Sequence, residues 1–182
     1  MDYGSEHEGS NAPNALASPE SPRHIRRMAL IDILPQLASG SAHTHALGFQ
    51  FEGLEGDTVR LRVPWRDDLV GDPQTGVIAG GLVTTLLDHV GGLAVWVKSG
   101  QFVPIATLDL RVDYMRPALT GRDVIAEARC YRLTHSIAFV RAWAFEDDPA
   151  DPVAAAQSAY VVDSRAGRGI GANLGPSKSA GV

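Results

Sequence analysis

Apolar and polar residues alternate along several short stretches of the chain, with the period of two that half-buried β-strands show. The clearest is 57–64, where two valines and a leucine alternate with Arg60 and Arg62. A second apolar stretch at 45–53 precedes it, and the sequence Gly-Leu-Glu-Gly at 53–56 joins the two. The pattern predicts a two-stranded hairpin.

Apolar residues recur at helical spacings from Pro22 to about Leu37, and Ser21 is placed to cap that segment. A short amphipathic helix is therefore expected before the hairpin. The connection from Pro64 through Gly71, Asp72 and Pro73 has the composition of a loop.

Four further strands are predicted at 104–115, 122–132, 136–146 and 152–163, separated by turn-like segments. One face of the last two strands is unusually small, so another element is able to pack closely against it. Its members are Ser136, Ala138, Val140, Ala142, Ala144, Ala154, Ala156 and Ser158. A helix, two strands, one long helix and four antiparallel strands make an α+β fold.

The long helix is predicted from the apolar run at 77–97, beginning near Ala79 or Gly80. About 20 apolar residues also suffice to cross a bilayer. Asp88 lies near the middle, however, where a carboxylate costs about 2.5–3.5 kcal/mol on membrane insertion. We therefore expect the core helix of a soluble domain and no membrane partner.

Composition narrows the class of protein further. The net charge is -5, with 16 basic against 21 acidic residues, so no basic surface for nucleic acid is expected. Cys130 is the only cysteine, which excludes an intrachain disulfide and favours a cytoplasmic location. Residues 1–22 lack the apolar segment of a signal peptide. We expect a disordered arm at 1–22, one domain at 23–164, and a disordered glycine-rich tail at 165–182.

Asp88 is the first candidate for chemistry. On a helical projection it shares a strip with Gly91 and Gly92, and each glycine costs about 1 kcal/mol of helix stability relative to alanine. Periodicity alone also allows an exposed polar face. The glycines favour a close-packed seam, where a carboxylate suits the role of general base or nucleophile.

Gly80 and Gly81 at the helix start form the second candidate element. The first N–H groups of a helix have no internal acceptor and are able to polarise a carbonyl oxygen, although a simple helix-entry turn would look the same. Gly80 and Asp88 are eight residues apart, about 12 Å along one helix. If both act on one substrate, two protomers must share the site. The sequence suggests helix pairing along Gly91, Thr84 and Gly92.

Residues 71–97, together with 107–118 and Gly121, resemble the phenylacetate-degradation type of hotdog-fold thioesterase. The similarity runs from about Leu47 to Val162. The resemblance implies a curved antiparallel sheet wrapped around the long helix, and homodimers that commonly assemble into tetramers. It also implies hydrolysis of acyl-CoA thioesters with no metal and no cofactor.

The family motif is a His-Gly-Gly sequence followed by an acidic residue seven positions after the second glycine, which here are Gly80, Gly81 and Asp88. Ala79 stands where the family usually has histidine. By the same resemblance, Thr107 positions water, and Asp72 is the nearest match to a loop asparagine.

These residues predict that the Gly80 N–H of one protomer polarises a thioester, while Asp88 of the other attacks it or activates a water held by Thr107. Trp96 is expected to narrow the acyl pocket. Expected substrate contacts are Ala79, Gly81, Asp72 and Thr84, with Arg116, Arg132 and His135 as cations for the CoA phosphates. The alternative function is a non-catalytic acyl-CoA-binding hotdog protein, a sensor or scaffold. The pair His43 and His45 lacks further ligands at metal spacing, so no metal is expected.

Overall fold

The computed structural model describes residues 22–163, with side chains from residue 28 onward. Its helices are α1 (Pro22–Ala38), α2 (Ala42–Leu47) and α3 (Gly80–Ser99), and a 3-10 turn spans Asp67–Leu69. Its strands are β1 (Gln50–Glu55), β2 (Thr58–Val63), β3 (Val70–Asp72), β4 (Val77–Ile78), β5 (Ile105–Tyr114), β6 (Val124–Leu133), β7 (Ile137–Phe145) and β8 (Ala154–Val162). The predicted disordered segments lie outside the described residues, except for Pro22, which begins α1.

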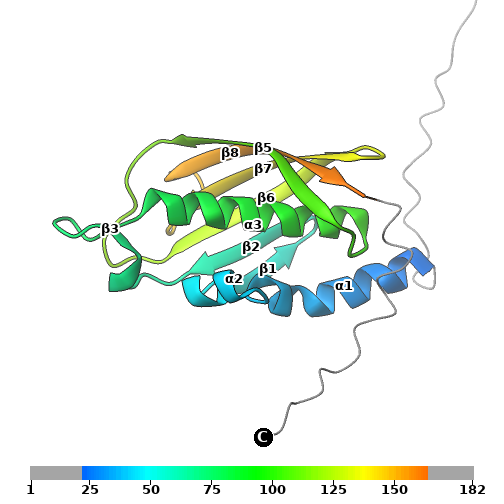
Figure 1. Ribbon diagram of the computed structural model, residues 1–182, viewed down its shortest axis with the longest axis horizontal. Helices are drawn as coiled ribbons and strands as arrows, with labels where there is room; N and C mark the ends of the chain where they lie inside the picture. The colour runs from blue at the N-terminus through cyan, green and yellow to red at the C-terminus, as the bar shows by residue number, and fades with distance from the viewer. Residues whose placement is uncertain (1–21, 164–182) are drawn as a thin grey trace, which may run out of the picture.

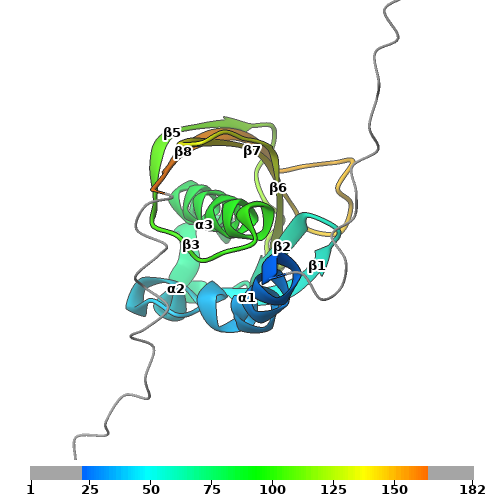
Figure 2. The same ribbon diagram turned by 90° about the vertical axis from the view of Figure 1, so that its right-hand side faces the viewer.

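Six strands form one antiparallel sheet in the order β1-β2-β6-β7-β8-β5, and β3 and β4 make a separate short hairpin. The sheet curves over α3, while α1 and α2 lie on the opposite side of that helix (Figures 1 and 2). The predicted α+β hotdog fold is confirmed. β5 and β1 are the two edges of the sheet.

α3 is the core helix because its apolar side chains recur at 3.6-residue spacing and meet the concave face of the sheet. Leu86 and Val90 are fully buried, and each such side chain contributes about 1.5–3 kcal/mol. Of the small residues predicted on the last two strands, Ala138, Ala144 and Ala154 are fully buried beside α3, whereas Ser136 precedes β7 and is exposed. By length and composition α3 alone among the described helices is apolar enough to span a membrane, but 56% of its most apolar window is buried inside the protein.

Three local predictions were wrong. Residues 45–47 belong to α2 and not to a strand, because Ser41 caps that helix: its hydroxyl accepts from the Thr44 amide at 3.0 Å, and Gly48 ends the helix with a φ of 76°. The connection after Pro64 contains the β3–β4 hairpin and not only a loop. The turn between β1 and β2 also comes later than predicted, at Gly56 and Asp57.

A β-bulge interrupts β5 at Leu108. Thr107 pairs with Tyr160 of β8, and the next pair is Asp109 with Ala159, so Leu108 is an extra residue. A bulge reverses which residues of a strand face inward. Thr107 before it and Tyr114 after it therefore both face α3, although they are seven positions apart and an odd spacing in a regular strand places two residues on opposite faces.

Candidate active site

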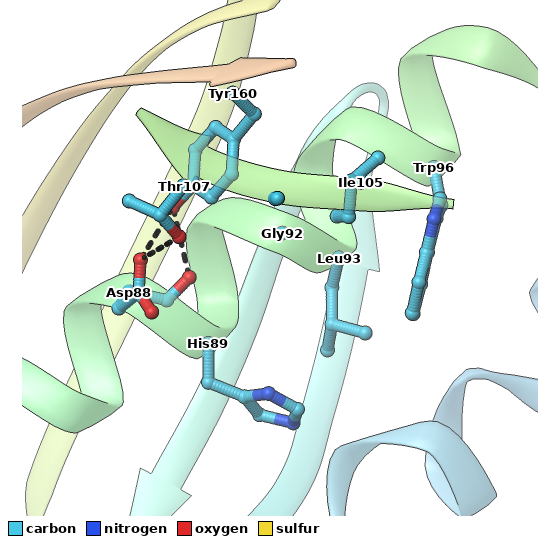
Figure 3. Close-up of a pocket in the computed structure, with 9 residues that line it drawn as sticks. Asp88, His89, Gly92, Leu93, Trp96, Ile105, Thr107 and Tyr160 are labelled. Atoms are coloured by element: carbon cyan, nitrogen blue, oxygen red, sulfur yellow. Dashed lines mark hydrogen bonds between the residues drawn. The ribbon is translucent and has the colours of Figure 1, made fainter. Parts of the chain in front are cut away.

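Asp88 lies midway along α3, and two strands of the sheet supply hydrogen-bond donors to it (Figure 3). The Thr107 hydroxyl on β5 donates to Oδ1 at 2.9 Å. The Tyr160 hydroxyl on β8 donates to the main-chain carbonyl oxygen of Asp88 at 2.9 Å and lies 3.3 Å from Oδ1. Asp88 and Thr107, two of the predicted site residues, are therefore in direct contact.

The two oxygens of the Asp88 carboxylate have different surroundings. Oδ1 faces the Thr107 and Tyr160 hydroxyls, whereas no group within the described part of the chain donates to Oδ2. A carboxylate held by one oxygen keeps the other available to accept a proton from water or to attack a carbonyl carbon.

A cavity of about 260 Å³ adjoins this carboxylate, between α3 and the start of β5. Trp96, which the sequence predicts to narrow an acyl pocket, lines this cavity, and its indole N–H donates to the Val103 carbonyl oxygen at 2.7 Å, which fixes the ring. The full lining is Asp88, His89, Gly92, Leu93, Trp96, Ile105, Ala106, Thr107 and Tyr160. Apart from the Asp88 end, most of this surface is apolar.

The first turn of α3 is a separate region, which does not line the cavity. Ala79 is the N-cap residue with no side-chain cap, and Gly80 and Gly81 are exposed. Tyr114 of β5 donates to the Gly80 carbonyl oxygen, and its hydroxyl lies 2.7 Å from that of Thr84. The first amides of a helix have no acceptor in a preceding turn, so those of Gly80 and Gly81 remain available as donors. Within one chain Gly80 does not meet Asp88.

Asp72 is the last residue of β3, where the β3–β4 turn begins, and it is exposed. Its carboxylate accepts from the Thr75 hydroxyl at 2.7 Å and from the Gln74 amide at 3.0 Å. These bonds lower the pKa of Asp72 below its ordinary value. Neighbouring Gly71 packs against Ala79, where a Cβ atom would lie 2.7 Å from the Ala79 Cα. The structure thus gives Asp72 a role in shaping the turn beside the helix start.

Arg116 has a structural role that the sequence did not reveal. Its guanidinium donates to Glu146 Oε1 at 3.0 Å, and the Glu146 side chain is only 2% exposed. Asp151 also contacts the guanidinium. A cation so engaged is a poor candidate for a CoA phosphate, and this prediction is not supported.

The other two predicted cations lie at the β6–β7 hairpin. Arg132 and His135 are exposed, and neither lines the cavity beside Asp88. The structure does not bring them together with the other predicted site residues. Among residues 22–163, no three His, Cys, Asp or Glu side chains are grouped to hold a metal ion.

The predicted helix-to-helix seam is wrong. Gly91 and Gly92 are buried against strands of the same chain. A Cβ atom on Gly91 would lie 2.2 Å from the Tyr160 hydroxyl oxygen, and one on Gly92 would lie 3.2 Å from Ile105 Cδ1. The glycines admit the chain's own sheet, so this strip of α3 is not open to a second helix.

His89 links the cavity to the N-terminal helix. Its Nε2 donates to the carbonyl oxygen of Ala38, at the end of α1, at 3.0 Å. Burial lowers the pKa of His89, opposed by this hydrogen bond and by the nearby Asp88 charge. The imidazole is therefore neutral near neutral pH and points away from the Asp88 carboxylate (Figure 3).

Sequence reasoning missed Tyr160 and Tyr114. One signal was present for Tyr160: it follows Ala154, Ala156 and Ser158 on the same face of β8, the only large residue in that small series. Nothing local marked Tyr114, because an uninterrupted β5 would turn it to the opposite face from Thr107.

Residues 75–153 match the model of the thioesterase superfamily. A Halobacterium salinarum protein named as a candidate esterase is 38% identical over 96 residues, which cover 50% of this chain and 61% of that protein. Human acyl-coenzyme A thioesterase 13 is 30% identical over 64 residues, covering 35% of this chain and 45% of the relative. The chain thus matches less than two thirds of the length of these relatives.

Solved structures match over more of the chain. A Pseudomonas aeruginosa protein has a TM-score of 0.66 and 36% identity, covering 72% of this chain and 98% of that protein. A variant of the phenylacetic acid degradation protein PaaI from Thermus thermophilus has a TM-score of 0.57 and 25% identity, with coverage of 66% and 98%. Fold, site geometry and these similarities agree in relating the chain to the thioesterase superfamily, whose model matches residues 75–153, and PaaI-like proteins are among its structural neighbours.

Proposed function

We propose that this chain hydrolyses acyl-CoA thioesters, with Asp88 of one protomer and the Gly80 amide of its partner acting on the same carbonyl group. The observation that carries the proposal is the Asp88 carboxylate. Thr107 holds one of its oxygens, and the carboxylate lines a cavity with apolar walls in a chain whose residues 75–153 match the thioesterase superfamily.

The cavity suits the acyl part of such a substrate. Leu93, Trp96 and Ile105 supply apolar walls, and apolar walls with few polar groups are typical of small-molecule sites. The name of the human relative supports CoA as the thiol. Arg132 and His135 remain candidates for CoA phosphates, since both are exposed.

The reaction has two possible routes that use the same residues. Asp88 Oδ2 takes a proton from a water whose oxygen attacks the thioester carbon, or Oδ2 itself attacks and forms an acyl anhydride that water later hydrolyses. In both, the oxyanion accepts from the Gly80 N–H, the C–S bond breaks, and the CoA thiolate leaves and is protonated. Ala79 stands where the family usually has histidine, but the Asp88 carboxylate and the Gly80 N–H that the reaction uses are both present.

The helix length supports a shared site. Gly80 and Asp88 are about 12 Å apart along α3, too far for one carbonyl group. The free edge strand β5 is the candidate pairing surface, since Leu108 and Tyr114 on it and Met115 directly after it are 59%, 48% and 58% exposed. Pairing of β5 with a partner copy would cover this edge. We propose a homodimer on this edge that assembles further into a tetramer, in the cytoplasm.

The test is release of free CoA by the purified chain from a panel of short aliphatic, aromatic and long-chain acyl-CoAs. Asp88→Asn should abolish release while the oligomer stays intact. Asp32→Asn, at an exposed residue of α1, is the matched control and should keep full activity. Binding of acyl-CoA without any release would favour the sensor or scaffold, and a monomer at micromolar concentration would exclude the shared site.

A further inference from the structure

Tyr160 is the most buried polar side chain that touches Asp88. It is 2% exposed, and its hydroxyl reaches both the main-chain carbonyl and the carboxylate of Asp88, at 2.9 and 3.3 Å. It also pairs across the sheet with Thr107, the other donor to Oδ1. Two neighbouring residues on adjacent strands therefore hold one carboxylate from the same side.

Gly91 makes this contact possible. A Cβ atom at residue 91 would lie 2.2 Å from the Tyr160 hydroxyl oxygen and 3.1 Å from its Cζ. The first distance is far shorter than atoms tolerate, and the tyrosine ring is buried in a closely packed core, so an added methyl group at residue 91 would have to displace it. Glycine in the middle of a helix is less stable than alanine. Its presence at residue 91 is explained because it leaves space for the Tyr160 hydroxyl.

The tyrosine is protonated throughout the range in which the protein would work. Burial raises the pKa of Tyr160, and the neighbouring Asp88 charge raises it further. Its hydroxyl therefore always has one proton to donate, which the main-chain carbonyl oxygen and Oδ1 of Asp88 share. A hydrogen bond to the charged form of a carboxylate favours that form and restricts its rotation.

We propose that Tyr160 is a positioning residue, which together with Thr107 fixes Oδ1 of Asp88 and leaves Oδ2 directed at the substrate, and that Gly91 admits it. The inference rests on the proposed thioesterase function. Tyr160 itself does not reach the reacting atoms. Its effect on catalysis passes through the orientation and charge of Asp88.

Tyr160→Phe removes the hydroxyl and keeps the ring. We expect kcat for the best acyl-CoA to fall about ten-fold, as for loss of one hydrogen bond to a charged group, with KM within about two-fold. The acidic limb of the pH profile of kcat should move to higher pH, because the carboxylate loses a donor. Tyr131→Phe, at an exposed tyrosine on β6, is the matched control and should change none of these quantities.

Gly91→Ala approaches the same contact from the other side. It should lower kcat at least as much as Tyr160→Phe does, because the added methyl group displaces the hydroxyl. In the double variant the nearest ring atom lies 3.1 Å from the new Cβ, so the second substitution should cost less than it does alone. Gly53→Ala, where a Cβ would meet nothing within 4 Å, controls for the glycine change itself.

The outcomes separate this inference from the proposed function. If the wild type releases CoA and Asp88→Asn does not, but Tyr160→Phe keeps the wild-type kcat and pH profile, the positioning role is wrong. If the wild type hydrolyses no acyl-CoA, the proposed function fails. In that case a crystal structure of Tyr160→Phe still tests whether Tyr160 positions Asp88. A displaced Asp88 carboxylate supports the positioning role, and an unchanged one overturns it.

Discussion

The Tyr114 hydroxyl donates to the main-chain carbonyl oxygen of Gly80, which ties the edge strand β5 to the first turn of α3. Thr84 approaches the same carbonyl oxygen, its hydroxyl 3.3 Å away. The carbonyl of Gly80 is therefore fixed from two sides, and the orientation of the helix start is fixed with it. An N–H group that stabilises an oxyanion is most effective when its orientation is fixed beforehand, because the protein then does not reorganise during the reaction.

Replacement of Gly80 with proline tests the amide donor directly. Proline is well accepted at the first position of a helix, and Ala79, with φ -58° and ψ 130°, already has the conformation that precedes proline. Only the N–H is lost. We expect kcat to fall about 10²–10³-fold, the usual loss for one oxyanion donor, with little change in the unfolding midpoint.

Gly80→Ala is the control for that experiment. Its Cβ would lie 3.5 Å from the Tyr114 hydroxyl, an ordinary contact, and the N–H is retained. It should keep most of the activity. Equal activity of the proline and wild-type proteins would show that the Gly80 amide takes no part in hydrolysis.

Arg116 should matter for stability and not for substrate affinity. Arg116→Ala leaves the buried Glu146 carboxylate with the Leu119 amide, 2.8 Å away, and without its cation. Loss of one partner of a buried pair costs about 3 kcal/mol, which urea unfolding measures. KM for acyl-CoA should stay the same in a sample kept folded.

Arg132→Ala provides the contrast. Because the Arg132 side chain is exposed, this substitution should change the free energy of unfolding by no more than about 0.5 kcal/mol. A higher KM for acyl-CoA in this variant would support Arg132 as a phosphate contact. If instead Arg116→Ala raised KM without loss of stability, the roles assigned here to the two arginines would be reversed.

We expect the protein to lose stability in mild acid because of His89. Because burial lowers its pKa in the folded chain below the ordinary 6.5, the unfolded chain binds the proton more readily. Stability from this group is complete above pH 6.5 and falls as pH drops below that value. The slope for one group is at most about 1.4 kcal/mol per pH unit.

The measurement compares urea unfolding of the wild type and His89→Gln at pH 7.5 and 5.5. The glutamine keeps an N–H for the Ala38 carbonyl but does not titrate in this range. The wild type should lose stability between the two pH values, and the variant should lose less. Parallel losses in both proteins would assign the pH dependence to other groups.

The fold could be predicted from the sequence because the hydrophobic patterns that specify its helices and strands are local and periodic. Alternation along 57–64 and helical spacing along 77–97 each specify an element and its buried face, and those predictions were confirmed for β2 and α3. α2 was missed because a helix of six residues has too few turns to show a period. Its capping box uses Thr44 in place of the usual glutamate or glutamine.

The candidate site was predicted only in part, because its remaining contacts depend on strand pairing. The sequence indicated that Gly91 and Gly92 admit a close neighbour, but not which one, and the neighbours are Tyr160 and Ile105 of the same chain. The bulge at Leu108 decides which residues of β5 face α3. Likewise, Arg116 looked like a free cation because Glu146 lies 30 residues away in the sequence.

A mixture of two inactive variants tests the shared site. In a mixed dimer of Gly80→Pro with Asp88→Asn, one of the two sites has both substitutions, and the other combines an intact Asp88 with an intact Gly80 amide. Random assortment makes half of the dimers mixed, so co-refolded protein should recover about a quarter of wild-type activity. If each site lay within one chain, every site would carry one substitution, and the mixture would be no more active than the average of its components. The separately refolded variants give that baseline, and size-exclusion chromatography confirms that the mixed sample is dimeric or larger.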